Sequence, residues 1–423
     1  MQLGHVYFYV LTLFLAVDVL RVRKINLLHV WVSAFIFIIL SEINTSAYLA
    51  YYENILTTSQ FFLLANNMVI LGYFSNSKQV IGKQGETENT HNKLRKSALF
   101  FMIGLTVLYV VNTFPFAIKS YVFGRAFAVS ESGGGFVDSI ISSLAYVLPA
   151  TYAYYFMKLK KPNLVWPLLL SIPIWFLLFL IGTRFHLLFS VLGLVIVGLS
   201  LRSTKLSTKN YVFLGLGAIM FLLTSIMMKQ SRTGLNPQGT VNISLDDSKR
   251  TLPQKVGAFG SNELVVDITT KLLKYYEDPT VKHQYGKASS FILYFWVPRA
   301  IWPDKPTMLG YWFIRKVQVV SENHSASLGF TGELFVDFGY FSLIVIFLIG
   351  WALKSSENFF IRCTRSKSLD LVIGAMFYPM IFFFVRSPVT SLMSFIGILA
   401  LFFILKKFFY QSENKAEVVN QVA

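Results

Sequence analysis

The chain has 423 residues, of which 54% are hydrophobic and only 14% are charged, and its mean hydropathy is +0.56. A soluble domain carries about 25% charged residues, so this composition excludes a soluble globular protein and predicts an integral membrane protein. The net charge of +17 does not indicate nucleic-acid binding, because Lys and Arg gather in short loops between apolar runs, where they set membrane topology.

Eleven apolar runs follow one another along the chain, and each is close to the length that crosses the hydrocarbon layer. A helix is the only open segment that pairs its own backbone groups in lipid, so each run predicts a helix. The expected fold class is all-α, a polytopic membrane protein of about eleven transmembrane helices. The runs are 5–20, 25–41, 57–75, 97–117, 136–157, 163–182, 185–201, 211–228, 331–353, 369–385 and 389–405.

The loops between these runs alternate in charge. Basic clusters follow the first, third, fifth, seventh, ninth and last runs, whereas the loop 42–56 has no Lys or Arg and the loop 118–135 has only Lys119 and Arg125. This pattern predicts that the N-terminus lies outside and the C-terminus in the cytoplasm. The first run leads directly into Arg21 without a small-residue cleavage site, so we expect a retained helix rather than a cleaved signal.

The segment 229–330 is far longer than the other loops and lies outside on this topology. Within it, 291–302 is apolar and aromatic but too short to span, and Pro298 and Pro303 indicate irregular backbone. We therefore expect an interfacial or re-entrant helix near 291–302. The predicted divisions are transmembrane helices in 1–228, an extracytoplasmic segment over 229–330, transmembrane helices in 331–407 and a flexible cytoplasmic tail over 408–423.

Common catalytic and cofactor motifs are absent from the sequence. It has no nucleotide-binding glycine loop, no zinc-binding H-E-x-x-H and no nucleophile elbow. The six histidines lack metal-ligand spacing and Cys363 is the only cysteine, so we expect neither a metal site nor a cofactor. Any chemistry then falls to charged residues at the outer membrane face.

Several arginines on that face suit phosphate binding. Arg184 lies beside His186 in the tight hairpin 182–186, and Arg386 begins the hairpin 386–388. A guanidinium group makes paired, charge-assisted bonds to phosphate or pyrophosphate; the alternative is an arginine that extends to lipid headgroups. Arg299 lies in an aromatic segment where a charge is costly unless it is paired or faces a cavity.

Aromatic and acidic residues complete the candidate set. Trp302 offers a face on which a sugar ring stacks, or else it anchors the chain at the interface. Glu333 lies at the outer entry of the ninth run, with Asp337 one turn further on the same face. Glu333 suits a general base acting on a sugar hydroxyl, and the alternative is a structural pair with an arginine. His324 is a second candidate base.

Three stretches carry a resemblance to a known family. The run Val297-Pro-Arg-Ala-Ile-Trp-Pro-Asp-Lys-Pro306, the stretch 332–340 with Glu333 and Asp337, and the turn Gly182-Thr183-Arg184 resemble the bacterial O-antigen and capsular repeat-unit polymerases of the Wzy type. The resemblance implies a GT-C-like glycosyltransferase bundle with a large periplasmic segment. It also implies a role in lipopolysaccharide synthesis, in the bacterial inner membrane, with the active site facing the periplasm.

The resemblance further implies a metal-independent transfer of the growing glycan from undecaprenyl pyrophosphate to the non-reducing end of a new lipid-linked unit. Arg184, Arg299 and Arg386 would hold the pyrophosphate, Arg299 would also act in catalysis, and Glu333 or His324 would accept the proton. The expected partners are the lipid-linked oligosaccharide, membrane lipid and a chain-length regulator, with no nucleic acid. The residues expected to contact the sugars are His186, Trp302, Asp304 and Lys305.

Two other functions use a similar architecture. A ligase that passes the finished glycan to the lipid A core would use the same arginines on the same pyrophosphate, and the P-R-x-I-W-P run favours the polymerase. A lipid-linked oligosaccharide flippase would show paired repeats and charges in the middle of the membrane, whereas here the charges gather at one face.

Overall fold

The computed structural model is all-helical throughout the part of the chain that it describes. Three helical stretches there are long and apolar enough to cross a bilayer, namely Lys96–Phe123, Gly329–Ser356 and Ser391–Phe409. The described residues are 50, 56–76, 96–124, 136–159, 161–201, 262–295, 297, 301, 302, 304, 305, 309–318, 328–366, 368–386 and 388–409.

The chain forms two compact units, each built from separate stretches of sequence. The first unit comprises Met1–Val80, Asn242–Ile361 and Met380–Met393. The second unit comprises Ile81–Val241, Arg362–Pro379 and Ser394–Ala423.

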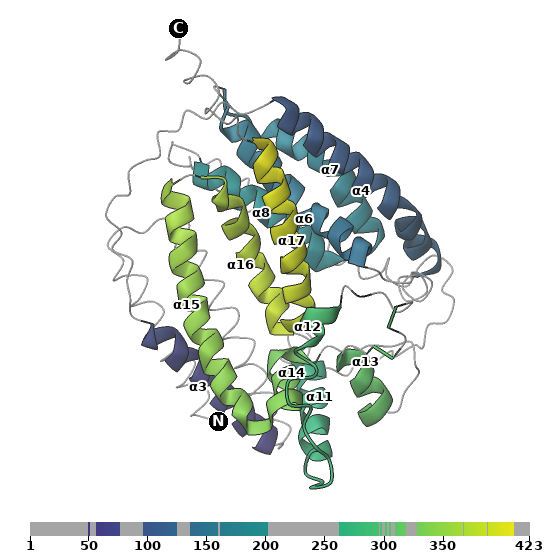
Figure 1. Cartoon of the computed structure of the whole chain (residues 1–423), viewed down its shortest axis with the longest axis vertical. Coiled ribbons are helices and arrows are strands. Elements are labelled where there is room, and N and C mark those ends of the chain that lie inside the picture. Colours follow the sequence, from purple (N-terminus) through teal and green to yellow (C-terminus); the bar gives the residue numbers. More distant parts are fainter. Residues whose placement is uncertain are drawn as a thin grey trace, which may run out of the picture. The chain divides into compact units, whose positions relative to one another are not determined.

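The second unit is a bundle around α6 (Phe136–Met157), which packs against α4 (Lys96–Phe123), α7 (Val165–Leu180) and α8 (Arg184–Leu201) (Figure 1). These helices are apolar around most of their circumference, as expected for helices covered by lipid and by each other.

Hydrogen bonds from small polar side chains link the helices of this bundle. Ser190 Oγ of α8 donates to the carbonyl of Ala145 in α6 over 2.6 Å, and Trp175 Nε1 of α7 donates to Ser190 Oγ over 2.9 Å. Thr106 and Tyr152 pair their hydroxyls at 2.7 Å between α4 and α6. Such bonds join helices where lipid leaves no hydrophobic drive for association.

In the first unit, α3 (Leu56–Ser75) packs closely on the first half of α15 (Ser342–Ser366) at two glycines. A Cβ on Gly72 would collide with the carbonyl oxygen of Phe347, and one on Gly350 would collide with that of Val69. One turn beyond Gly72, Asn76 Nδ2 donates to the carbonyl of Trp351 over 3.0 Å. Phe61, near the start of α3, packs on Tyr340, just before α15, whereas Asn76, just after α3, donates to Ser355 Oγ over 2.7 Å, so the two helices run in the same direction.

The predicted ninth span, 331–353, is not one helix. The chain forms α14 (Gly329–Phe338), a single 3-10 turn and then α15. Gly339 ends α14 with φ +55°, a conformation that residues with a Cβ rarely adopt. A Cβ at this position would also collide with the ring of His283. Nine of the ten α14 residues, Gly329 to Asp337, are buried, so this helix packs within the first unit before α15 begins.

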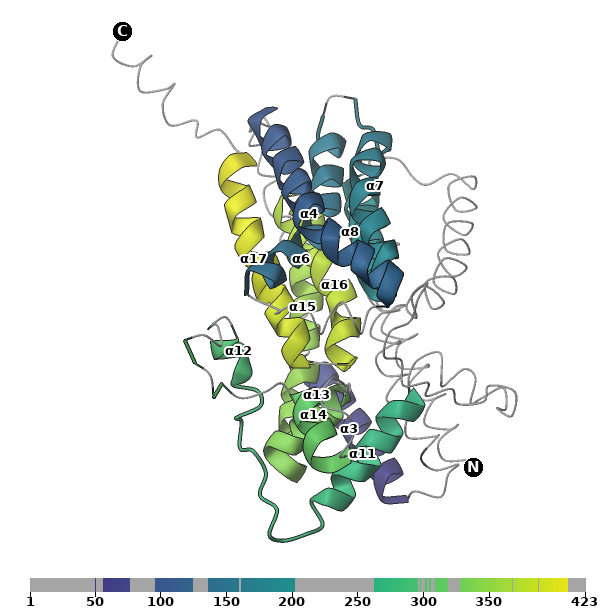
Figure 2. The ribbon, with the colours of Figure 1, turned by 90° about the vertical axis from the view of Figure 1, so that its right-hand side faces the viewer.

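The long segment contributes α11 (Asn262–Tyr275), α12 (Phe291–Tyr294) and α13 (Leu309–Phe313), which continues as a π-helical turn, Ile314–Gln318. α11 is amphipathic, and its apolar face packs on α14 and α3, which lie beside it in Figure 2. Among the described residues of the predicted interfacial helix 291–302, only the first four are α-helical, so the described helix is shorter than predicted.

A buried carboxylate holds the loop 276–290 on α14. Asp337 is fully buried, and it accepts hydrogen bonds from the backbone N–H groups of Ala288 and Ser289, at 3.1 and 2.7 Å, and from the hydroxyl of Ser289. The Asp337 carbonyl also accepts from the N–H of Tyr285 over 2.8 Å. We call these bonds the Asp337 clamp.

α3, α7 and α8 follow the predicted runs to within two positions at each end, and α6 has the predicted bounds, 136–157, whereas α4 and α15 extend past the ends of their runs. The agreement extends to α16 (Asp370–Arg386) and α17 (Pro388–Phe409), which follow the last two predicted runs. The count of eleven spans stays a prediction, because the runs 5–20, 25–41 and 211–228 lie outside the described residues, as does the tail after residue 409.

Substituting Gly72 or Gly350 by Ala is expected to destabilise the protein by about 1–3 kcal/mol, since backbone must move to admit each methyl group. The matched control is Gly104→Ala in α4, where no atom lies within 4 Å of the added Cβ. Thermal unfolding in detergent should show a lower midpoint for the first two variants only. Equal midpoints for all three would refute the close α3–α15 packing.

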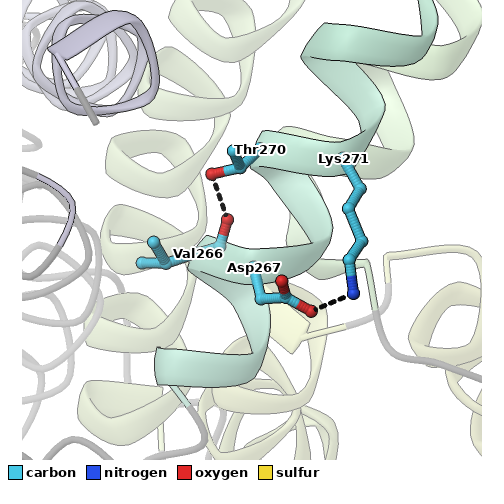
Figure 3. Close-up of polar contacts among 4 residues, drawn as sticks. All are labelled: Val266, Asp267, Thr270 and Lys271. Carbon is cyan, nitrogen blue, oxygen red and sulfur yellow. Dashed lines mark hydrogen bonds and ion pairs between the residues drawn. The ribbon is translucent and has the colours of Figure 1, made fainter. Parts of the chain in front are cut away.

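Asp337→Ala is expected to release the loop 276–290, because each buried donor left without an acceptor costs about 1–3 kcal/mol. Trypsin should then cleave faster after the exposed Lys282 and Lys287. The control is Asp267→Ala, which removes only an exposed pair with Lys271 on the α11 surface (Figure 3). If both variants are cut at the wild-type rate, the clamp does not hold this loop.

Candidate functional site

The turn that presents Arg184 is closed by two backbone hydrogen bonds. The N–H of Gly182 donates to the carbonyl of Phe179 over 2.9 Å, and the N–H of Thr183 donates to that of Leu178 over 3.2 Å. This pair of bonds is the Schellman motif, which needs a left-handed residue after the helix, and Gly182 has φ +72°. The predicted tight hairpin is therefore present, and glycine is what permits it.

α8 begins immediately after this turn. The carbonyl of Thr183 accepts from the N–H of Leu187 over 3.1 Å, which places Arg184 in the first turn of the helix. A helix N-terminus favours anions through its N–H groups and its dipole. His186, two residues on, stacks on Tyr146 with ring centroids 5.5 Å apart. The side chain of Arg184 lies outside the described part of the structure.

Glu333 of α14 meets the turn that carries Arg386. α16 ends at Arg386, and α17 begins two residues later at Pro388, a residue that suits the first helical position. Glu333 is 6% exposed, and its Oε2 accepts from the N–H of Val389 over 3.3 Å. A carboxylate at a helix N-terminus is stabilised by the helix dipole, so Glu333 has a structural role in holding this turn.

Lys305 has a structural contact that the sequence did not predict. Its Nζ donates to the carbonyls of Phe295 and Val297 over 2.7 and 3.0 Å, and it lies 5.2 Å from the ring centroid of Phe291. These bonds fold the chain after α12 back on itself, which explains why the helix is short.

Trp302 packs beside Tyr294 at a ring distance of 5.3 Å but remains 40% exposed, so part of its ring is open to a ligand or to lipid. Asp304 is also exposed. Both residues therefore stand at the surface of the first unit, where a substrate could reach them.

The structure brings together only some of the predicted site residues. Glu333 and the Arg386 turn are in contact within the first unit, through Val389. Arg184 and His186 belong to the second unit, so their convergence with the others stays a prediction. Arg299 and His324 lie outside the described residues, as does the side chain of Arg386.

The structure also shows polar groups that the sequence did not single out. In the described part of the chain, the buried hydroxyl of Tyr276 and Nδ1 of His283 have no hydrogen-bond partner, although the two rings stack at 4.2 Å. Burial, followed by the nearby charges of Tyr275 and Asp337, raises the pKa of Tyr276 above its ordinary value. No motif marks this pair, because a loop brings His283 back over the end of α11.

Comparison with known proteins gives one match. The family model described as O-antigen polysaccharide polymerase Wzy matches residues 4–268, more than half of the chain. The match includes the Arg184 turn but ends before the run 297–306 and before Glu333. No curated protein and no solved structure matches the chain. The chain therefore belongs to the O-antigen polysaccharide polymerase Wzy family, inner-membrane enzymes that polymerise lipid-linked repeat units.

Proposed function

We propose that this protein transfers the growing glycan from undecaprenyl pyrophosphate to the non-reducing end of a new lipid-linked repeat unit. The observation that carries the proposal is the family match over residues 4–268, which contains the Arg184 turn at the start of α8. That turn places an arginine in the first turn of a helix, and both arginine and a helix N-terminus are suited to binding a diphosphate group.

The pyrophosphate is proposed to bind to Arg184, Arg386 and Arg299. In the transfer, the bond between the anomeric carbon and the pyrophosphate oxygen breaks, and the electron pair leaves with undecaprenyl pyrophosphate. Negative charge therefore grows on the leaving group, and guanidinium groups already in position stabilise it without a metal ion. Arginine suits this role better than lysine because its planar fork pairs with two phosphate oxygens at once.

The acceptor sugar hydroxyl attacks the anomeric carbon, and its proton is proposed to pass to Glu333, with His324 as the second candidate. The bond from the N–H of Val389 to Oε2 orients the carboxylate, and a base must be held in position to act. The exposed face of Trp302 suits stacking on a sugar ring, and Asp304, Lys305 and His186 complete the proposed sugar contacts.

A periplasmic site also agrees with the direction of the helices. The predicted topology has the third and ninth runs both crossing from outside to inside, which requires α3 and α15 to be parallel. The contacts of Phe61 with Tyr340 and of Asn76 with Ser355 advance in the same direction along both helices, which agrees with this topology. Membrane lipid and a chain-length regulator are the further partners that we propose.

Deleting the gene in its host separates the polymerase from the two alternatives. Loss of a polymerase should leave lipid A core with a single repeat unit on a glycan gel. Loss of a ligase would leave bare core with polymer still on the carrier lipid, and loss of a flippase would leave bare core with single units retained inside. Either of the last two patterns would overturn the proposal.

Arg184→Ala and Arg386→Ala are each expected to reduce polymer at least tenfold, with Lys restoring only part of it, because an ammonium group cannot make the paired contact. The assay is polymer formed per unit of membrane-inserted protein. Arg362→Ala is the control, since Arg362 is exposed on α15 and lies within the predicted cytoplasmic loop after the ninth run. Wild-type polymer in both test variants would exclude these arginines from the site.

Glu333→Gln tests the base against the capping role. Gln keeps an oxygen that accepts from the N–H of Val389 but accepts no proton from a hydroxyl, so polymer should fall by about 10²–10⁴-fold while thermal stability changes little. Glu333→Ala should lose both activity and stability. If Glu333→Gln polymerises normally and Glu333→Ala is unstable, Glu333 only holds the turn and His324 becomes the candidate base.

A further inference from the structure

We propose that the loop 276–290 is an anchor to the outer leaflet of the membrane, with Tyr285, like Tyr340 and Phe341, at the depth of the lipid headgroups. The inference concerns the first unit alone and does not depend on the proposed reaction.

The first observation is an apolar stripe along α15. Phe341, Ile344, Leu348 and Trp351 are spaced as one helical face, and their exposed fractions run from 77% at Phe341 to 48% at Trp351. They belong to Gly329–Ser356, a stretch long and apolar enough to cross a bilayer. We therefore expect lipid tails to cover this face, whose first exposed apolar residue is Phe341.

The second observation is that tyrosines lie where this stripe begins. Tyr340 is 61% exposed and precedes Phe341, while Tyr285 is 74% exposed and its N–H bonds to the carbonyl of Asp337, three residues before Tyr340. Tyrosine is enriched at the boundary between lipid and water, because its ring is apolar and its hydroxyl is polar. The pair therefore indicates the level of the outer membrane surface.

The third observation is the backbone of Tyr285, which has φ +50°, the one positive φ of a non-glycine residue in the described structure. A residue with a Cβ is strained in this conformation, so surrounding bonds must impose it. The Asp337 clamp does so, together with the bond from the N–H of Gln284 to the carbonyl of Val336 at 3.0 Å. The protein thus holds an exposed aromatic ring rigidly outward, although the ring gains nothing from its own interior.

The charges of the loop fit the same placement. Lys282 and Lys287 are exposed on either side of Tyr285, where they suit anionic headgroups. The acids Glu277 and Asp278 lie at the other end, next to α11, and Asp278 is occupied by hydrogen bonds from Thr280 that lower its pKa.

The anchor has a consequence for the proposed reaction. The Asp337 clamp joins the loop to α14, and Glu333 lies one turn earlier on that helix. A loop seated among the headgroups would therefore set the depth of Glu333 at the level where a lipid-linked diphosphate lies. This consequence rests on the proposed function, whereas the contact with lipid does not.

The test relies on the chain having a single cysteine, which can be replaced so that only an introduced cysteine is labelled. In a Cys363→Ser background, Tyr285→Cys, Tyr340→Cys, Ile344→Cys and Asp267→Cys are labelled one at a time with the dye NBD in nanodiscs. The quenchers are a headgroup spin label, a spin label at carbon 12 of the acyl chain, and iodide in water. Ile344 marks the hydrocarbon and Asp267, in its charged pair with Lys271, marks the water.

At positions 285 and 340 we expect the headgroup label to quench at least twofold more strongly than the acyl-chain label, with partial quenching by iodide. Position 344 should show the reverse order of the two lipid labels. Quenching at both 285 and 340 by iodide alone, as at 267, would overturn the anchor and leave Tyr285 to a glycan or a protein partner. Polymer assays on the same variants report on the reaction separately, so each proposal can fail without the other.

Discussion

In the first unit, the buried carboxylate of Asp337 holds the loop 276–290 on α14. A helix that ends at Gly339 leaves carbonyl groups without helical partners, and a 15-residue loop, 276–290, must be held somewhere if it is not to move freely. The side chain of Asp337 holds the loop by accepting hydrogen bonds from Ala288 and Ser289. The carbonyls at the end of α14, those of Val336 and Asp337, find their partners in the N–H groups of the same loop. Because an ionised or partly charged group is costly to bury without partners, all these bonds must form together.

Most of the helices were predictable because hydrocarbon imposes a simple rule on length. A run of apolar residues that must satisfy its own backbone becomes a helix, and the loop charges give its direction. This rule found α6 and α8 almost residue by residue. It could not find the break at Gly339, because hydropathy does not register a positive φ or the approach of the His283 ring. It also overextended the helix at 291–302, where Lys305, 14 residues after Phe291, binds the carbonyls that a longer helix would have used.

The candidate site was predictable to a lesser degree. Gly182 followed by Arg184 indicated a tight turn, and the Schellman motif that closes it needs this glycine. The contact between Glu333 and Val389 joins residues 56 positions apart, and no local sequence pattern predicts such a contact. The family match ends at residue 268, whereas the P-R-x-I-W-P run that carried much of the resemblance begins near residue 298. The family match therefore shows the family without testing the run 297–306, whose resemblance stays a prediction.

In the proposed mechanism, Glu333 would both hold the start of α17 and act as the base. A carboxylate has two oxygens, and Oε2 bonds to the N–H of Val389 at the start of α17. That bond restrains the carboxyl plane, so the second oxygen would point in a set direction when an acceptor hydroxyl arrives. A carboxylate base suits a reaction whose leaving group departs readily. In such a reaction the acceptor hydroxyl loses its proton late, after the new bond to the anomeric carbon has made that hydroxyl acidic. Pyrophosphate is such a leaving group, so in the proposed mechanism a carboxylate held in position at Glu333 and guanidinium groups on the diphosphate would act together.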